Sequence, residues 1–100
     1  MNINEICTSI LDVEKDLLEG KIQFTYDNLA CAMKFDHPGW ELDDILAEIF
    51  FDARAGKDPD REKVENVLKG LKRFKRAFKV KELSKPIKDL TQYLADTESI

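Results

Sequence analysis

Residues 59–83 read PDREKVENVLKGLKRFKRAFKVKEL, and this pattern predicts one helix with two unlike faces. Apolar residues recur at steps of three and four positions, which is the spacing of one side of an α-helix. They are Val64, Val67, Leu68, Leu71, Phe74 and Phe78. Asp58 and Pro59 supply a helix cap and a proline at the first helical position. We therefore predict a single long helix over residues 59–83 whose apolar face is part of the core.

The opposite side of this predicted helix is strongly basic. No acidic residue occurs between Asn66 and Lys81. The basic residues predicted to share one side are Lys69, Lys72, Arg73, Arg76 and Lys79, with Lys75 and Lys81 flanking them. A helix side of this kind can neutralise phosphates or meet an acidic protein surface. We interpret it as a candidate partner-binding face, and the alternative is a solvated face that pairs in part with acidic residues of the same chain.

The charge of the whole chain is unevenly distributed. Residues 1–65 contain 16 acidic and 7 basic residues, a balance of −9, whereas residues 66–100 contain 4 acidic and 9 basic residues, a balance of +5. The protein is acidic overall, with a net charge of −4. Such a dipolar chain can pair internally, pair with a second copy of itself, or steer a charged partner.

Helical patterns cover most of the chain. Asn2 followed by Glu5 resembles a capping box at the start of the first amphipathic helix. The predicted helices span residues 3–19, 26–34, 40–55, 59–83 and 86–95. Because short turns join them, we predict an all-α fold, a compact bundle of four to five helices. The length fits a single domain over residues 1–100, with a frayed tail from about residue 96.

The predicted helix 40–55 is apolar around much of its circumference and acidic on the remainder. Such a helix is either central in a bundle or partly covered by a partner. Aromatic side chains beside charges are frequent anchors of protein interfaces. A second candidate partner-binding surface therefore comprises Trp40, Glu41, Asp44, Glu48, Phe51 and Asp52. For Trp40 and Phe51 we prefer burial in the core, and exposure of either would make this helix a docking surface.

No motif in the sequence points to a particular reaction or metal. The single histidine, His37, lies beside Asp36 in a Pro-Gly turn, and the sequence ties no nucleophile to this pair. Cys7 and Cys31 are far apart and too few for a four-ligand zinc site, so we predict reduced thiols in or near the core. The carboxylates of residues 41–52 lack the loop spacing of a calcium site. We predict no enzyme activity, no catalytic residue, no metal and no cofactor.

The same patterns narrow the choice of partner. The apolar runs are too short to span the roughly 30 Å of a bilayer core, and the N-terminal residues lack the features of a signal peptide, so a cytoplasmic location is the default expectation. We predict a regulatory protein (an adaptor, inhibitor or immunity-type regulator) that binds another protein, or a second copy of itself, through charged helix faces. The alternative is a nucleic-acid-binding regulator that uses the basic face of helix 59–83, although the acidic isoelectric point near 5.0 disfavours it.

Overall fold

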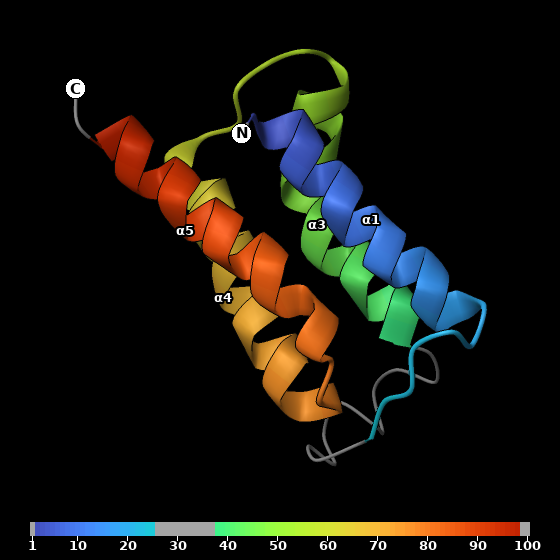
Figure 1. Cartoon of the computed structure of the whole chain (residues 1–100). Coiled ribbons are helices and arrows are strands. Elements are labelled where there is room, and N and C mark those ends of the chain that lie inside the picture. Colours follow the sequence, from blue (N-terminus) through green and yellow to red (C-terminus); the bar gives the residue numbers. More distant parts are fainter. Residues whose placement is uncertain (1, 26–37, 99–100) are drawn as a thin grey trace.

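The computed structural model describes residues 2–25 and 38–98, and within them it contains four α-helices, one short 3₁₀ helix and no strand (Figure 1). The elements are α1 (Ile3–Leu18), α3 (Pro38–Arg54), α4 (Arg61–Phe78), η1 (Lys81–Leu83) and α5 (Ser84–Glu98). This arrangement confirms the predicted all-α bundle. The helix predicted over residues 26–34 lies outside the described residues, as do Cys31, Asp36 and His37.

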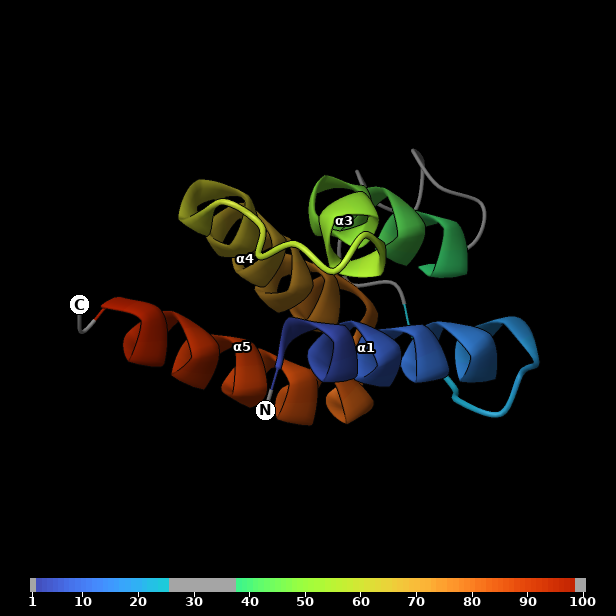
Figure 2. The ribbon, with the colours of Figure 1, turned by 90° about the horizontal axis from the view of Figure 1, so that it is seen from above.

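The four α-helices are arranged in two layers. Seen from above, α1 and α5 form one layer and α3 and α4 form the other (Figure 2). Each helix packs against two others, because α1 contacts α3 and α5, and α4 contacts the same two helices. The apolar sides of all four helices therefore face a shared interior.

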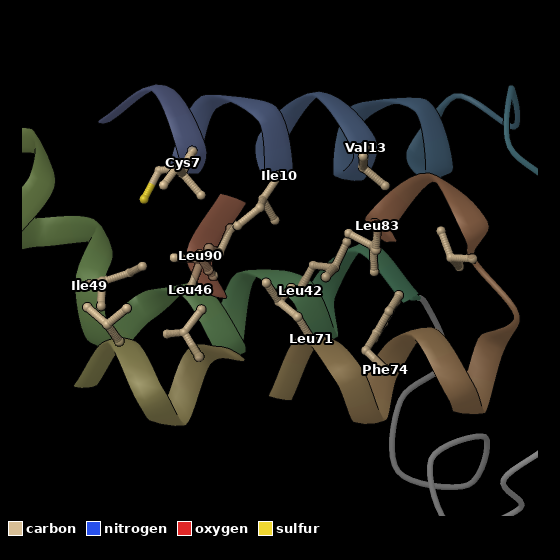
Figure 3. Packing of buried hydrophobic residues seen from close by; sticks show 14 of the residues in the cluster. Cys7, Ile10, Val13, Leu42, Leu46, Ile49, Leu71, Phe74, Leu83 and Leu90 are labelled. Atoms are coloured by element: carbon tan, nitrogen blue, oxygen red, sulfur yellow. The ribbon is translucent and has the colours of Figure 1, made fainter. Parts of the chain in front are cut away.

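The apolar face of α4 is a wall of this interior, as its sequence pattern predicts. Leu71 and Phe78 are fully buried, and Phe74 is 1% exposed. The rings of Phe74 and Phe78 lie 4.6 Å apart between centroids, at a tilt of 41°. Figure 3 shows Leu71 and Phe74 pointing into the same interior as side chains from α1 and α3. The apolar side of helix α4 is thus committed to the core and is not part of any surface.

The start of α1 follows the predicted cap. The backbone N–H of Glu5 donates a hydrogen bond of 2.9 Å to Oδ1 of Asn2, whose extended backbone makes it the N-cap residue. The side-chain amide of Asn2 also donates to the Glu5 carboxylate at 3.4 Å. This cap satisfies one of the amide groups that the first turn of a helix leaves without an intrahelical acceptor. Helix α1 then ends at Leu18, before Gly20 with a φ of 73°.

The structure differs from the sequence prediction at the end of α4. The predicted segment 59–83 is divided, because α4 stops at Phe78 and Lys79 adopts a left-handed conformation with a φ of 57°. The chain then turns through η1 and begins α5 at Ser84. Pro86, which we expected at the start of the last helix, lies within its first turn, where a missing N–H leaves no intrahelical hydrogen bond broken.

The end of α5 is held by a residue of α4. Nη1 of Arg61 donates to the backbone oxygen of Leu94 at 2.9 Å and to Oγ1 of Thr97 at 3.3 Å. Helix α5 accordingly continues to Glu98, two residues beyond the point from which a frayed tail was predicted. This contact connects the first turn of α4 to the last turns of α5.

Candidate partner-binding surfaces

The outer side of α3 exposes two large aromatic side chains. Trp40 is 58% exposed and Phe51 is 77% exposed. This finding overturns the preferred prediction that both are buried in the core. The core side of α3 is occupied by Leu42, Leu46 and Ile49, each at most 1% exposed. Because Trp40 and Phe51 are eleven residues apart, about three helical turns, they lie on the same side of the helix, opposite that core side.

Further exposed residues lie between the two aromatic residues. Positions 40, 44, 47 and 51 follow the helical spacing of one side, and position 48 lies beside them. We name this exposed stripe the α3 outer face, and its members are Trp40, Asp44, Ala47, Glu48 and Phe51. Phe51 contacts the half-buried ring of Phe50 edge-on at 6.5 Å, and the guanidinium of Arg54 lies 4.2 Å above that ring. The face therefore combines aromatic surface with negative charge.

Two residues predicted for the acidic and aromatic surface do not lie on this face. Glu41 is 5% exposed and is directed toward α4, where it lines a small surface groove of about 230 Å³. Asp52 is half-buried and pairs with Lys63 of α4 at 3.5 Å. Both positions lie on the side of α3 that meets α4. The sequence pattern grouped these carboxylates, and Glu41, Asp44 and Glu48 do line one groove together, whereas Asp52 pairs with Lys63.

The predicted basic face is also divided. Arg73 lines the groove between α3 and α4 that also contains Glu41, Asp44 and Glu48. Lys69 is exposed and lines neither this groove nor the larger groove formed by α4, η1 and α5. The remaining residues of the face gather at the other side of α4, near its C-terminal end. Arg73 thus lies near the acidic residues of α3, and it forms no ion pair with any residue that the structure describes.

A second and larger groove lies where the C-terminal half of α4 meets η1 and α5. Its volume is about 570 Å³. We name it the basic groove, and the described residues that line it are Lys72, Lys75, Arg76, Lys79, Lys81 and Ile87. Three of the five residues of the predicted face line it, together with the two flanking lysines. The turn at Lys79 brings Lys81 and Ile87 to this position.

No carboxylate is found among the described residues that line the basic groove, whereas some other cations of the described chain pair with one. Lys21 pairs with Glu19 at 2.8 Å, and Arg61 pairs with Glu65 at 3.0 Å. Within residues 2–25 and 38–98, by contrast, Lys72, Lys75, Arg76 and Lys81 take part in no ion pair. Cations in the last turn of a helix are favoured by the partial negative charge of the terminal carbonyl groups, which is a local reason for Lys75 and Arg76.

A pair of carboxyl groups joins α1 to α3. Glu14 is half-buried and its carboxyl group forms a hydrogen bond with that of Asp43. Burial, the hydrogen bond and the negative charge of Asp43 together raise the pKa of Glu14 to about 7. Its Oε2 atom is buried without a hydrogen-bond partner in the described part of the chain. Sequence reasoning missed this pair, because each residue by itself resembles an ordinary solvated acid of a helix surface.

The described residues contain neither a cluster of metal ligands nor an activated cysteine thiol. No group of three or more His, Cys, Asp or Glu side chains lies close enough in residues 2–25 and 38–98 to hold a metal. Cys7 is a free thiol that is 4% exposed, and burial raises its pKa. A buried thiol with a raised pKa is a poor nucleophile. Among the helices described, none is both long and apolar enough to cross a membrane.

Comparisons of the chain with protein-family models, with curated proteins and with solved structures gave no match in any of the three. The surfaces described above are therefore the basis on which a function can be proposed.

Proposed function

We propose that the protein is a small, cytoplasmic, non-enzymatic interaction module that binds another protein through the α3 outer face. The observation that supports this proposal is the exposure of Trp40 and Phe51, at 58% and 77%, on one side of one helix. Large apolar surface in contact with water is unfavourable, and its burial contributes about 25 cal/mol per Å². Tryptophan, tyrosine and arginine are also the residue types most enriched among the interface residues whose replacement by alanine weakens binding most.

The charge of the face indicates the chemistry of the partner. Asp44 and Glu48 lie between the two aromatic residues and are both exposed. A partner with basic side chains around apolar pockets would complement this arrangement, and such complementarity mainly increases the association rate and the selectivity. A module that covers a surface of this kind acts as an adaptor, an inhibitor or an immunity-type regulator, depending on what the covered surface does.

A second copy of the chain is the sub-case in which the partner is the protein itself. The α3 outer face carries negative charge, and the basic groove carries positive charge on different helices. The two unlike surfaces can meet reciprocally across a two-fold axis, whereas a single contact of this kind per pair of copies would generate rings or open chains. Sedimentation velocity over a range of protein concentrations distinguishes this sub-case from a foreign partner.

Nucleic acid, the alternative predicted from the sequence, is less well supported by the arrangement of the basic residues. A duplex would follow a continuous basic stripe, whereas Arg73 lines the groove that contains Glu41, Asp44 and Glu48 and does not line the basic groove. No aromatic residue of the described part of the chain lines the basic groove, so these residues give a base no ring to stack upon.

The experiment that tests the proposal compares three forms of the protein as bait for affinity capture from the source lysate. They are the wild type, Trp40→Ala/Phe51→Ala and Leu18→Ala. Leu18 is the matched control, because it is 46% exposed but lies at the end of α1. Capture is performed at two salt concentrations, with and without nuclease. We expect a protein partner that the wild type and Leu18→Ala retain, that resists nuclease, and that the double variant loses.

The captured partner is then purified and titrated calorimetrically against each form. Loss of two aromatic anchors should weaken binding by about thirtyfold or more, which corresponds to about 2 kcal/mol. Circular dichroism checks that the double variant keeps its helical content. The same partners on all three baits, or a partner set that disappears with nuclease, would contradict the proposal.

A further inference from the structure

The basic groove is a concentration of positive charge in a protein that is acidic overall. Of the six described residues that line it, five are cationic and the sixth is apolar. On α4, Lys75 follows Lys72 by three residues and Arg76 follows it by four, so both are neighbours of Lys72 on the helix surface. Like charges at these spacings repel each other, and a bound anion would offset this repulsion.

Some cations of the described residues pair with carboxylates. Lys63 pairs with Asp52, and Arg61 with Glu65. Lys72, Lys75, Arg76 and Lys81 form no ion pair with any residue that the structure describes. The groove thus presents side-chain donors that an external anion can bind without displacing an internal partner.

The shape and surroundings of the groove indicate a compact anion. Its volume of about 570 Å³ lies within the roughly 300–1,000 Å³ of typical small-ligand sites. The half-buried side chain of Ile87 supplies an apolar wall, and the described residues that line the groove include no aromatic ring for a base to stack upon. The protein as a whole carries a net charge of −4, which disfavours a long polyanion that extends beyond the groove.

We propose that the basic groove binds a compact polyphosphate, a ligand that carries several phosphate groups close together. The groups belong either to a free small molecule or to the headgroup of a lipid, since both present the same chemistry to lysine and arginine side chains. Lys72, Lys75 and Arg76 bind the phosphates from α4, and Lys81 binds from η1. This inference does not depend on the function proposed for α3, because the two surfaces share no residue.

Isothermal titration calorimetry with inorganic tripolyphosphate tests the inference. The wild type is compared with Lys72→Glu/Arg76→Glu and with the matched control Lys15→Glu/Lys57→Glu, which changes the net charge equally. Lys15 and Lys57 are exposed and lie outside the groove. We expect binding at low ionic strength that weakens with added salt, is reduced roughly tenfold or more by the groove variant, and changes little in the control.

A milder variant and a second probe keep the result interpretable. Lys72→Ala/Arg76→Ala leaves good helix formers in α4 and should weaken binding severalfold, in case charge reversal perturbs the helix. Phosphatidylcholine vesicles that contain phosphatidylinositol bisphosphate distinguish the two sources. Vesicle binding that tripolyphosphate displaces identifies a lipid headgroup, whereas binding of tripolyphosphate alone identifies a free ligand, and either result supports the proposal.

Three results would overturn the proposal. The first is the absence of any heat of binding with tripolyphosphate at low ionic strength. The second is an equal loss of affinity in the groove variant and in the control, which would show that only net charge matters. The third is a short DNA duplex that binds more tightly than tripolyphosphate through Lys72 and Arg76, which would assign the groove to nucleic acid.

Discussion

Gly70 of α4 lies so close to Ile45 of α3 that a methyl group at position 70 would be 2.9 Å from Cγ2 of Ile45 and 3.2 Å from its Cγ1. The Cγ2 atom is attached to the branched Cβ, which has little rotational freedom in a helix. The absence of a side chain at Gly70 therefore lets α3 and α4 approach each other. This close approach also explains why a residue of poor helix propensity occupies the middle of α4.

We expect Gly70→Ala to destabilise the protein although alanine is the better helix former. The gain in helix propensity is about 1 kcal/mol, whereas overpacking at a rigid contact costs about 1–3 kcal/mol. The net loss in the free energy of unfolding should be about 1 kcal/mol, measured by urea denaturation followed by circular dichroism. Ile45→Ala removes the obstructing atoms, so the double variant should lose less than the sum of the single variants. A more stable Gly70→Ala protein would contradict the observed contact.

Truncation of the α4 core face should be severely destabilising. Phe74 is 1% exposed and Leu71 is fully buried, so replacement of either by alanine leaves a cavity. We expect a loss of about 2–5 kcal/mol for each variant in urea denaturation. Lys69→Ala on the exposed side of the same helix is the control and should change stability by no more than about 0.5 kcal/mol. A change below about 0.5 kcal/mol for Phe74→Ala would mean that this side of α4 is not in the core.

The carboxyl pair of Glu14 and Asp43 should make stability depend on pH. The pKa of Glu14 is raised from 4.5 to about 7 in the folded protein, so the folded state holds this proton more tightly than the unfolded state. The resulting stabilisation is fully present below the unfolded value of 4.5, and it is lost as the pH rises from there toward about 7. Urea denaturation at several pH values between these limits and slightly alkaline pH measures the effect.

Glu14→Gln should remove most of this dependence, because the amide bears no charge that could repel Asp43. At slightly alkaline pH we expect the variant to be more stable than the wild type by about 1 kcal/mol, a modest value because solvent screens a pair that is only partly buried. At acidic pH the two proteins should be similar. Parallel stability curves over the whole range would show that Glu14 titrates normally.

Removal of the N-terminal cap of α1 should have a smaller and more local effect on stability. Asn2→Ala removes the 2.9 Å hydrogen bond to the N–H of Glu5 and should cost about 1 kcal/mol in thermal or urea denaturation. Asn2→Asp keeps an acceptor at the same position and should retain most of the stability. Asn4→Ala, a change of the same type within the helix, should be neutral or slightly stabilising. Equal losses of stability for Asn2→Ala and Asn2→Asp would show that the side-chain acceptor at position 2 does not stabilise the helix.

Much of the fold can be predicted from the sequence, because its strongest signals are local. The three- and four-residue spacing around Leu71 and Phe74 correctly predicts both the helix and its buried face. The cap at Asn2 is likewise visible, since its partner is only three residues away. The end of α4 is not visible in the same way. Val80 and Leu83 are both fully buried, so the apolar spacing continues through a break that only the backbone conformation of Lys79 reveals.

The candidate surfaces were predicted less completely, because they depend on contacts between helices. Trp40 and Phe51 were expected in the core, as large apolar residues usually are. They are exposed because Leu42, Leu46 and Ile49 already cover the side of α3 that meets the core. Nothing in the sequence of either helix indicates the contact between Glu14 and Asp43.

The same dependence on contacts explains the division of the predicted basic face. Lys72 and Arg76 were correctly placed on one side of the helix. Their grouping with Lys81 and Ile87 requires the turn between α4 and α5, which the sequence pattern did not indicate.

The position of Trp40 has a practical consequence for spectroscopy. It is the only tryptophan of the chain, and it is already largely hydrated in the folded protein. Its fluorescence should therefore shift little when the bundle melts, which makes intrinsic emission a poor reporter of unfolding. A molecule that settles over the indole would instead shift the emission to shorter wavelength, so the unlabelled protein carries its own optical probe of docking.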